Sequence, residues 1–216
     1  MARHKTVTKI WPTLDVLAAA CAAQRVNGTY IKVPYQLGGE VKRHTNRELV
    51  YQFLEDPSYN MDVDREQAEE IKTFYQGMSF KILSGGFLTE FDRKVMKILE
   101  QEFTPEGYDL AVLCSVPESY MKSKVREDGD RRMRFARGGY VSRVGDKVAM
   151  DVEVVKTIYS HNWATWYISA INSQDQAIFF AYKTDITVGT LLSIKGTVKR
   201  HRDDGVTQLN RVKVIK

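Results

Sequence analysis

The chain has 216 residues, of which 43% are hydrophobic and 27% charged, and its formal net charge is +5. These proportions are ordinary for a globular protein and exclude a disordered, collagen-like or disulfide-rich chain. The longest apolar run, residues 16–23, is far shorter than the ~20 residues that a membrane span needs. No signal-peptide core follows the basic N-terminus. We therefore expect a cytoplasmic protein without a membrane partner.

The charge is divided unevenly along the chain. Residues 1–130 carry 17 Lys and Arg against 20 Asp and Glu, a net charge of −3, whereas residues 131–216 carry 15 against 7, a net charge of +8. A strongly basic half favours a polyanionic partner. The alternative is a basic domain that binds nothing in particular.

Residues that support metal or catalytic chemistry are sparse. Cys21 and Cys114 lie in apolar runs, which predicts buried, reduced thiols, and neither the cysteines nor the four histidines have a zinc-site spacing. Asp62 and Asp64 could form an acidic pair for a metal, but a helix start with Asp64 as its N-cap explains them better. The P-loop and dinucleotide motifs are missing. We predict no catalytic residue, no metal and no cofactor.

Helical patterns account for most of residues 1–121. Thr13, Asn46 and Thr89 are the expected N-caps, with Asp92 completing a capping box at Thr89, and Gly85-Gly86 ends the third helix. The predicted helices run over about 14–25, 46–54 and 65–83, from Thr89 to before Pro105, and from 110 toward Met121, with an extended piece over 30–34. All these features have an ordinary core explanation.

Residues 122–138 combine mixed charge, glycines and few apolar side chains. This composition is typical of a solvated linker. A second interpretation is a basic arm that contacts phosphates, with Arg132, Arg134 and Arg137 as its candidate residues.

From Tyr140 onward the hydrophobic period changes to two, beginning with Val148, Met150, Val152 and Val154. Further strands are predicted over Trp163–Ile171, Ala177–Lys183, Leu191–His201 and Val206–Ile215. Five strands in about 75 residues favour a closed barrel, because an open sheet of this size leaves exposed edges. Gly196 fits a barrel corner. An OB fold is the expected form, with an SH3-like barrel as its rival.

The predicted fold class is therefore α+β: a helical N-terminal domain over residues 1–121, a basic linker over 122–138 and a five-stranded OB-like barrel over 139–216.

Alternation predicts which side chains of the barrel face outward. Trp166 and Ile168 belong to the core face of the second strand, and one of Phe179 and Phe180 must point outward. An outer face with aromatic rings and cations suits single-stranded nucleic acid, because rings stack on bases and cations bind phosphates. The alternative is that the aromatics are core residues and the lysines keep the surface soluble. The candidate residues of the barrel are Trp163, Tyr167, Phe179, Lys183, Lys195, Lys199, Arg200, His201, Arg202, Arg211 and Lys213.

Two segments near the C-terminus carry a resemblance. Residues 189–201 read GTLLSIKGTVKRH and residues 205–215 read GVTQLNRVKVI. They resemble the end of a domain of many bacteriophage and plasmid proteins, with the pattern GxxxxxKGTVKxH and a following GxxQTxLxR hairpin. Residues 139–147 resemble the start of that domain, and residues 74–103, with the GFLT turn at 86–89, resemble the helical unit before it. The resemblance implies an OB-like module of phage DNA metabolism with no defined enzyme activity.

The sequence thus predicts a non-catalytic protein that binds single-stranded nucleic acid, most simply DNA, in phage-type replication, recombination or repair. A second hypothesis is an adaptor that binds a replication, transcription or host protein through the barrel or the helical domain. The third hypothesis is that the protein is an enzyme.

Overall fold

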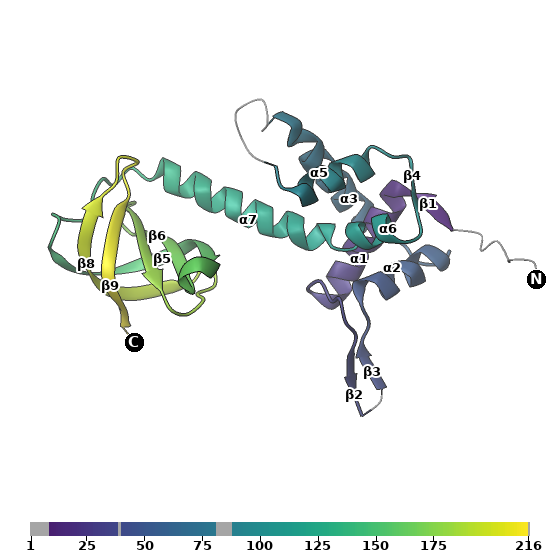
Figure 1. The fold of residues 1–216 in the computed structure, drawn as a ribbon, viewed down its shortest axis with the longest axis horizontal. Coiled ribbons are helices and arrows are strands. Elements are labelled where there is room, and N and C mark those ends of the chain that lie inside the picture. The colour runs from purple at the N-terminus through teal and green to yellow at the C-terminus, as the bar shows by residue number, and fades with distance from the viewer. Residues whose placement is uncertain (1–8, 39, 81–87, 216) are drawn as a thin grey trace, which may run out of the picture. The chain divides into compact units, whose positions relative to one another are not determined.

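A computed structural model describes residues 9–38, 40–80 and 88–215 of the chain. The protein is of mixed α+β class and divides into two compact units, residues 1–121 and 122–216 (Figure 1). The boundary between them falls inside helix α7 (Val116–Phe135). The first unit is mostly helical and the second contains a closed β-barrel.

Helix α1 (Thr13–Asn27) is the centre of the first unit. Residues 16–23 are all between 0 and 1% exposed, so the helix is buried on every side rather than along one stripe. The predicted capping role of Thr13 is wrong. Pro12 precedes the helix, and the Thr13 hydroxyl lies 2.9 Å from that of Thr104. The surrounding helices are α2 (Asn46–Glu55), α3 (Asp62–Gly77), α5 (Glu90–Leu99), α6 (Tyr108–Leu113) and the first residues of α7.

Capping boxes begin two of these helices. The box predicted at Thr89 is confirmed, since its hydroxyl accepts a hydrogen bond from the Asp92 N–H at 3.1 Å. Helix α2 begins one residue differently from the prediction. Thr45, not Asn46, is the N-cap, and it forms its box with Glu48. The Asn46 side chain accepts a hydrogen bond from a preceding loop N–H instead.

Helix α3 begins at Asp62, so Asp64 lies in the first turn and is not the predicted N-cap. Its carboxylate is buried and accepts two hydrogen bonds from Arg25, at 3.1 and 2.8 Å. The predicted helix end at Gly85-Gly86, and the GFLT turn as far as residue 87, lie outside the described residues.

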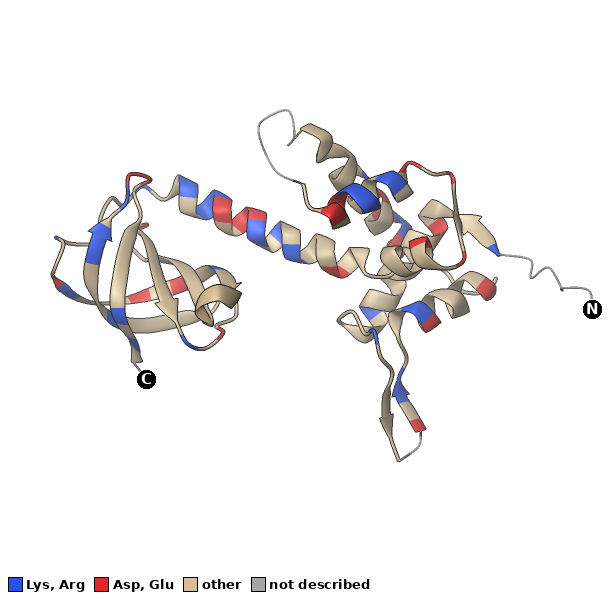
Figure 2. Cartoon of the chain, viewed as in Figure 1, with Lys and Arg blue, Asp and Glu red and all other residues tan. Residues whose placement is uncertain are grey.

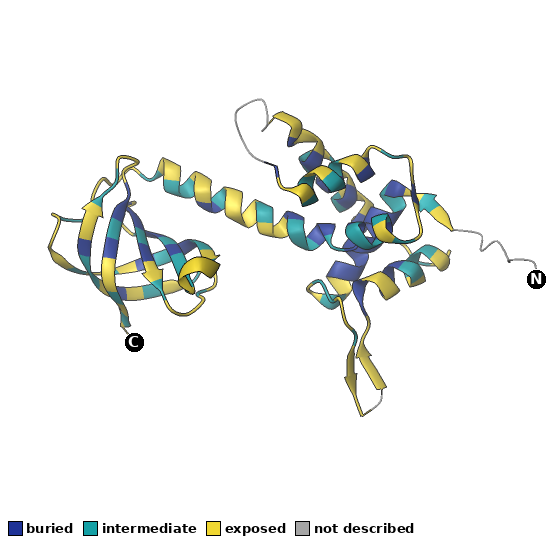
Figure 3. Ribbon diagram, in the orientation of Figure 1, coloured by how far each residue is buried: buried dark blue, intermediate teal, exposed yellow. Residues whose placement is uncertain are grey.

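Short strands complete the first unit. Strand β1 (Ile10–Pro12) pairs with β4 (Phe103–Pro105), and β2 (Tyr35–Leu37) pairs with β3 (Glu40–Arg43). The prediction missed both pairs: it extended the helix that starts at Thr89 to before Pro105, whereas α5 ends at Leu99, and its extended piece stops at residue 34. All described residues of the β2–β3 hairpin are exposed (Figure 3).

The structure also differs from the predicted linker. Residues 122–135 are helical and belong to α7, whereas the helix expected from 110 to 121 is divided between α6 and α7. Helix α7 packs against a barrel strand through Gly129, where an added Cβ would lie 2.3 Å from the Val155 carbonyl oxygen. Arg132 pairs with Glu153 in the same contact. The composition of this segment did not predict a helix, because Gly129 and charged side chains, rather than an apolar stripe, form its contact with the strand. Figure 2 shows the alternating charges along α7.

The barrel strands are β5 (Lys147–Ser160), β6 (Thr165–Asn172), β7 (Ala177–Tyr182), β8 (Leu191–His201) and β9 (Thr207–Ile215). They close in the order β5-β6-β7-β9-β8. Neighbouring strands are antiparallel except β7 and β9, which are parallel. The bounds of β8 are those predicted. Strand β6 begins later than predicted because His161–Trp163 form a 3-10 turn, η1.

The alternation of faces is confirmed at the centre of the barrel. Ile168, Phe180, Ile194 and Val198 are all 0–1% exposed. At Gly196 the register between β8 and β9 shifts, and an added Cβ would lie 3.2 Å from a β9 carbonyl oxygen. The glycine therefore permits the close approach of the two strands at this bulge.

Candidate nucleic-acid interface

Two aromatic rings lie side by side on the outer face of β6 and β7. Because Ile168 and Phe180 point into the core, their neighbours Tyr167 and Phe179 point outward. The centroids of the Tyr167 and Phe179 rings are 5.6 Å apart, and the ring planes are inclined by 37°. Both side chains are half-buried, so each ring is held by its neighbours and still meets solvent.

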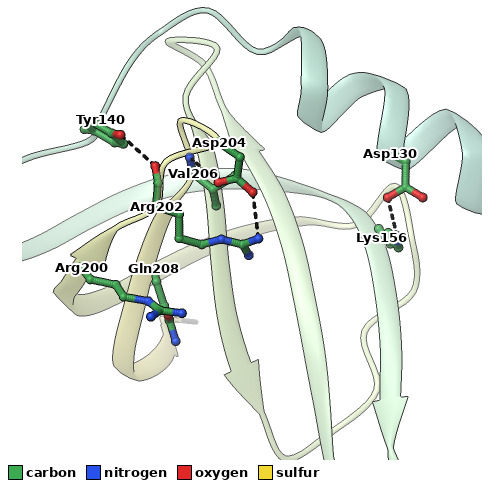
Figure 4. A network of polar contacts seen from close by, with 8 residues as sticks. All are labelled: Asp130, Tyr140, Lys156, Arg200, Arg202, Asp204, Val206 and Gln208. Atoms are coloured by element: carbon green, nitrogen blue, oxygen red, sulfur yellow. Dashed lines mark hydrogen bonds and ion pairs between the residues drawn. The ribbon is translucent and has the colours of Figure 1, made fainter. Parts of the chain in front are cut away.

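Arg200 lies near the end of β8, and Arg202 lies directly after it (Figure 4). The Arg202 guanidinium is 5.7 Å from the centroid of the Phe179 ring and pairs with Asp204 at 2.8 Å. Arg200 Nε donates a hydrogen bond to Gln208 Oε1 at 2.7 Å. Gln208 is the register partner of Phe179 across the parallel β7–β9 pair. The parallel pairing thus brings both arginines to the aromatic face.

His201 has a structural role that the sequence did not indicate. Its Nε2 lies 2.7 Å from the Ser142 carbonyl oxygen, and its ring stacks on Tyr140 with centroids 4.0 Å apart. The Tyr140 hydroxyl donates a hydrogen bond to the Arg202 carbonyl oxygen at 2.8 Å. Tyr140 and His201 together hold the base of the Arg202 loop. Local periodicity could not have found Tyr140, because its partners are about 60 residues away in the chain.

A separate group of cations lies on β8 and β9. Lys195 and Lys213 are direct register partners, and both are exposed. Arg211 is exposed at the bulge with a φ of 53°, and Lys199 is exposed beside the second register shift. None of the four forms an ion pair with any described residue. Like charges directly opposite in a sheet destabilise it, so this arrangement favours a bound anion.

Trp163 and Lys183 lie at the other end of β6 and β7. Trp163 is in η1 and is 74% exposed, so it is on the surface as predicted but in the β5–β6 loop rather than in a strand. Lys183 is exposed directly after β7, and the last pair of β6 and β7 joins Trp166 to Tyr182. Both candidates therefore lie near the β5–β6 end of the face.

The three arginines of the predicted arm have different surroundings. Arg132 donates two hydrogen bonds to Glu153, at 2.7 and 2.8 Å, and these bonds lower the pKa of the Glu153 carboxyl. Arg134 is exposed. The Arg137 guanidinium is exposed and lies 5.9 Å from the Phe135 ring. The structure thus engages Arg132 in the fold and leaves the other two at the surface.

The described residues contain no group of three or more His, Cys, Asp or Glu side chains that could hold a metal ion. Cys21 and Cys114 are buried free thiols, as predicted, and burial raises the pKa of each to about 12. Of the helices that the structure describes, none has the length and apolar character to cross a membrane.

Scans against protein-family models, curated proteins and solved structures found no match to this chain. The resemblance to phage and plasmid proteins therefore stays a prediction.

Proposed function

We propose that the barrel is an OB fold that binds single-stranded nucleic acid, most simply DNA, without catalysing a reaction. Its support in the fold is the closed five-stranded barrel with strand order β5-β6-β7-β9-β8. OB folds are five-stranded Greek-key barrels that bind oligonucleotides on the face of their second and third strands and with the loops after the first and fourth strands. In this barrel those elements are β6, β7 and the loops that contain Trp163 and Arg202.

The observation that carries the proposal is the adjacency of Tyr167 to Phe179, and of Phe179 to Arg202, on that face. Each ring offers a stacking surface worth roughly 1–3 kcal/mol per base. Arg202 is paired with Asp204, but a surface ion pair is worth only about 0–1 kcal/mol, so a phosphate can replace the carboxylate at small cost. Lys195, Lys199, Arg211 and Lys213 extend the positive surface for the backbone of the strand.

Titration of the full-length protein with a fluorescently labelled oligothymidine at several salt concentrations tests the proposal. The logarithm of the affinity should fall with the logarithm of the salt concentration, by roughly 0.7 for each phosphate contact. Tyr167→Ala and Phe179→Ala should each weaken binding about 10-fold or more. Tyr108→Ala is the matched control, because Tyr108 is a 72% exposed aromatic residue of the helical unit. Lack of binding at low salt would overturn the proposal.

Preference among nucleic acids is measured with the same assay. We expect single-stranded DNA to compete more strongly than the duplex, because the bases of a duplex are already stacked on each other. The resemblance to phage and plasmid proteins extends the proposal to DNA replication, recombination or repair.

An adaptor function is the second candidate, and the β2–β3 hairpin favours it. Tyr35, Leu37 and Val41 are 56, 60 and 42% exposed. An isolated two-stranded hairpin is marginally stable, and exposed apolar side chains on it favour a protein partner. Pull-down from a nuclease-treated lysate with the wild-type protein and with Leu37→Asp tests this candidate. A stoichiometric partner that the variant loses supports an adaptor.

A further inference from the structure

A groove of about 450 Å³ lies between α7 and the β5–β6 hairpin, within the second unit. Its volume is in the range of ligand-binding sites. Val125, Ile158 and Trp166 contribute apolar surface, Tyr159 contributes a further ring, and Lys122, Arg126 and Lys156 contribute cations. None of these residues belongs to the aromatic face described above.

The rings of the groove are arranged for stacking. Tyr159 is 39% exposed, and its ring centroid is 5.1 Å from that of Trp166. The rings of Tyr159 and His161 are nearly perpendicular, at 88°, with centroids 5.0 Å apart. A ring that packs against two neighbouring rings and is exposed on part of its surface can stack on the flat face of a base.

Arg126 and Lys156, two of the cations that line the groove, differ in their partners. Lys156 pairs with Asp130 of the same helix, whereas Arg126 is exposed and pairs with no carboxylate in the described ranges. A guanidinium beside aromatic rings is the chemistry that binds a nucleotide, since the ring takes the base and the cation takes the phosphate.

The groove adjoins the aromatic face of the barrel. Ile158, which lines the groove, is the direct register partner of Tyr167 on the neighbouring strand. Opposed side chains of an antiparallel pair have Cβ atoms only about 5 Å apart. Ile158 and Tyr159 point to opposite sides of β5, and both line the groove. A nucleic-acid strand that leaves Tyr167 therefore meets Ile158 at the rim of the groove that also contains Tyr159 and Arg126.

We infer that single-stranded nucleic acid bound on the aromatic face continues into this groove, where Tyr159 stacks on a base and Arg126 binds the adjoining phosphate. The inference rests on the proposed function and lengthens its binding site. It requires that the groove contributes to the affinity for long strands but not for short ones, because a short strand is fully accommodated on the aromatic face.

The experiment compares labelled oligothymidines of about 5 and about 15 nucleotides, near the limits of OB-fold site sizes. Tyr159→Ala and Arg126→Glu should each weaken binding of the long strand about 10-fold and leave the short strand within about twofold. Arg126→Glu should also lower the salt slope for the long strand by about 0.7. Unchanged affinity for the short strand shows in the same assay that the variants are folded.

Arg131→Glu is the matched control. It makes the same charge change on α7, but Arg131 pairs with Asp128 and does not line the groove. Variants that leave both strands unaffected, or weaken both equally, would overturn the inference while the proposed function stands. A wild-type protein that binds neither strand would instead refute the proposed function itself.

Discussion

The helical unit and the barrel use their cations differently. In the helical unit, ion pairs join separate helices, with N–O distances of 2.7–2.8 Å; the pairs are Arg25–Asp64, Arg65–Asp15 and Lys94–Asp109. On the outer face of β8 and β9, in contrast, exposed cations face each other without carboxylates, as at Lys195 and Lys213. Charges of the first kind stabilise the fold, whereas those of the second kind cost stability. The difference directs the search for a ligand to the barrel.

The largest expected effect is a difference in stability between substitutions on the two faces of β7. Phe180→Ala should lower the free energy of unfolding by about 3–5 kcal/mol, because it opens a cavity in the barrel core. Phe179→Ala should lower it by about 1 kcal/mol or less, because its ring is on the outer face. Denaturant unfolding of the full chain measures both, and equal losses would contradict the assignment of the faces.

The next effect tests the contact between α7 and β5. Gly129→Ala should cost about 1–3 kcal/mol, since the new Cβ would lie 2.3 Å from the Val155 carbonyl oxygen. Gly77→Ala is the matched control in the helical unit, where nothing lies within 4 Å of an added Cβ, and it should be neutral or stabilise by up to about 1 kcal/mol. Calorimetry measures the stability of the two variants against the wild type. If both are equally stable, α7 does not pack on β5 in this way.

Removing one cation from each unit should change stability in opposite directions. Arg25→Met leaves the buried Asp64 carboxylate without its partner and should cost about 1–3 kcal/mol. Lys195→Met removes the repulsion with Lys213 and should stabilise by a few tenths of a kcal/mol, while it weakens oligonucleotide binding. Unfolding and binding are measured on the same samples. A Lys195 variant that loses stability would contradict the proposed contrast.

The smallest effect is a pH dependence of the α7–β5 contact. Arg132 lowers the pKa of Glu153 in the folded protein, so the ion pair contributes fully above the ordinary glutamate pKa. The contribution is lost as the pH falls through the lowered pKa, that is, in the acid range below the ordinary glutamate pKa. Both side chains are about one third exposed, so the loss should stay below about 1 kcal/mol. The stability difference between wild type and Glu153→Gln, measured against pH, should shrink in this range. A constant difference would argue against the pair.

Some elements were predictable because their signals are local. The Thr89 capping box needs only a threonine and an acidic residue three positions later, and β8 is a long alternating run between turn residues. Asn46 misled the prediction because Thr45 competes for the same role, and the presence of Glu48 three residues after Thr45 decides between them. The segment 122–135 misled it because Gly129 is there for close approach to a strand, not for flexibility.

The candidate site was partly predictable for the same reason. Alternation along β6 and β7 predicted that Tyr167, and one of Phe179 and Phe180, point outward. It could not predict that Arg202 reaches Phe179, since that contact depends on the parallel pairing of β7 and β9. Tyr140 and the groove beside Tyr159 were missed, because each joins segments far apart in the chain.

The sequence by itself determined the change from helical to strand period, the uneven distribution of charge and the alternation of the two faces along each strand. These follow from neighbouring positions, where a period of two or of 3.6 residues dictates the exposed face. Only the tertiary structure decided which outward residues meet. Strand order, the packing of α7 on β5 and the engagement of Arg132 and His201 in the fold arise from long-range contacts, which no local pattern encodes.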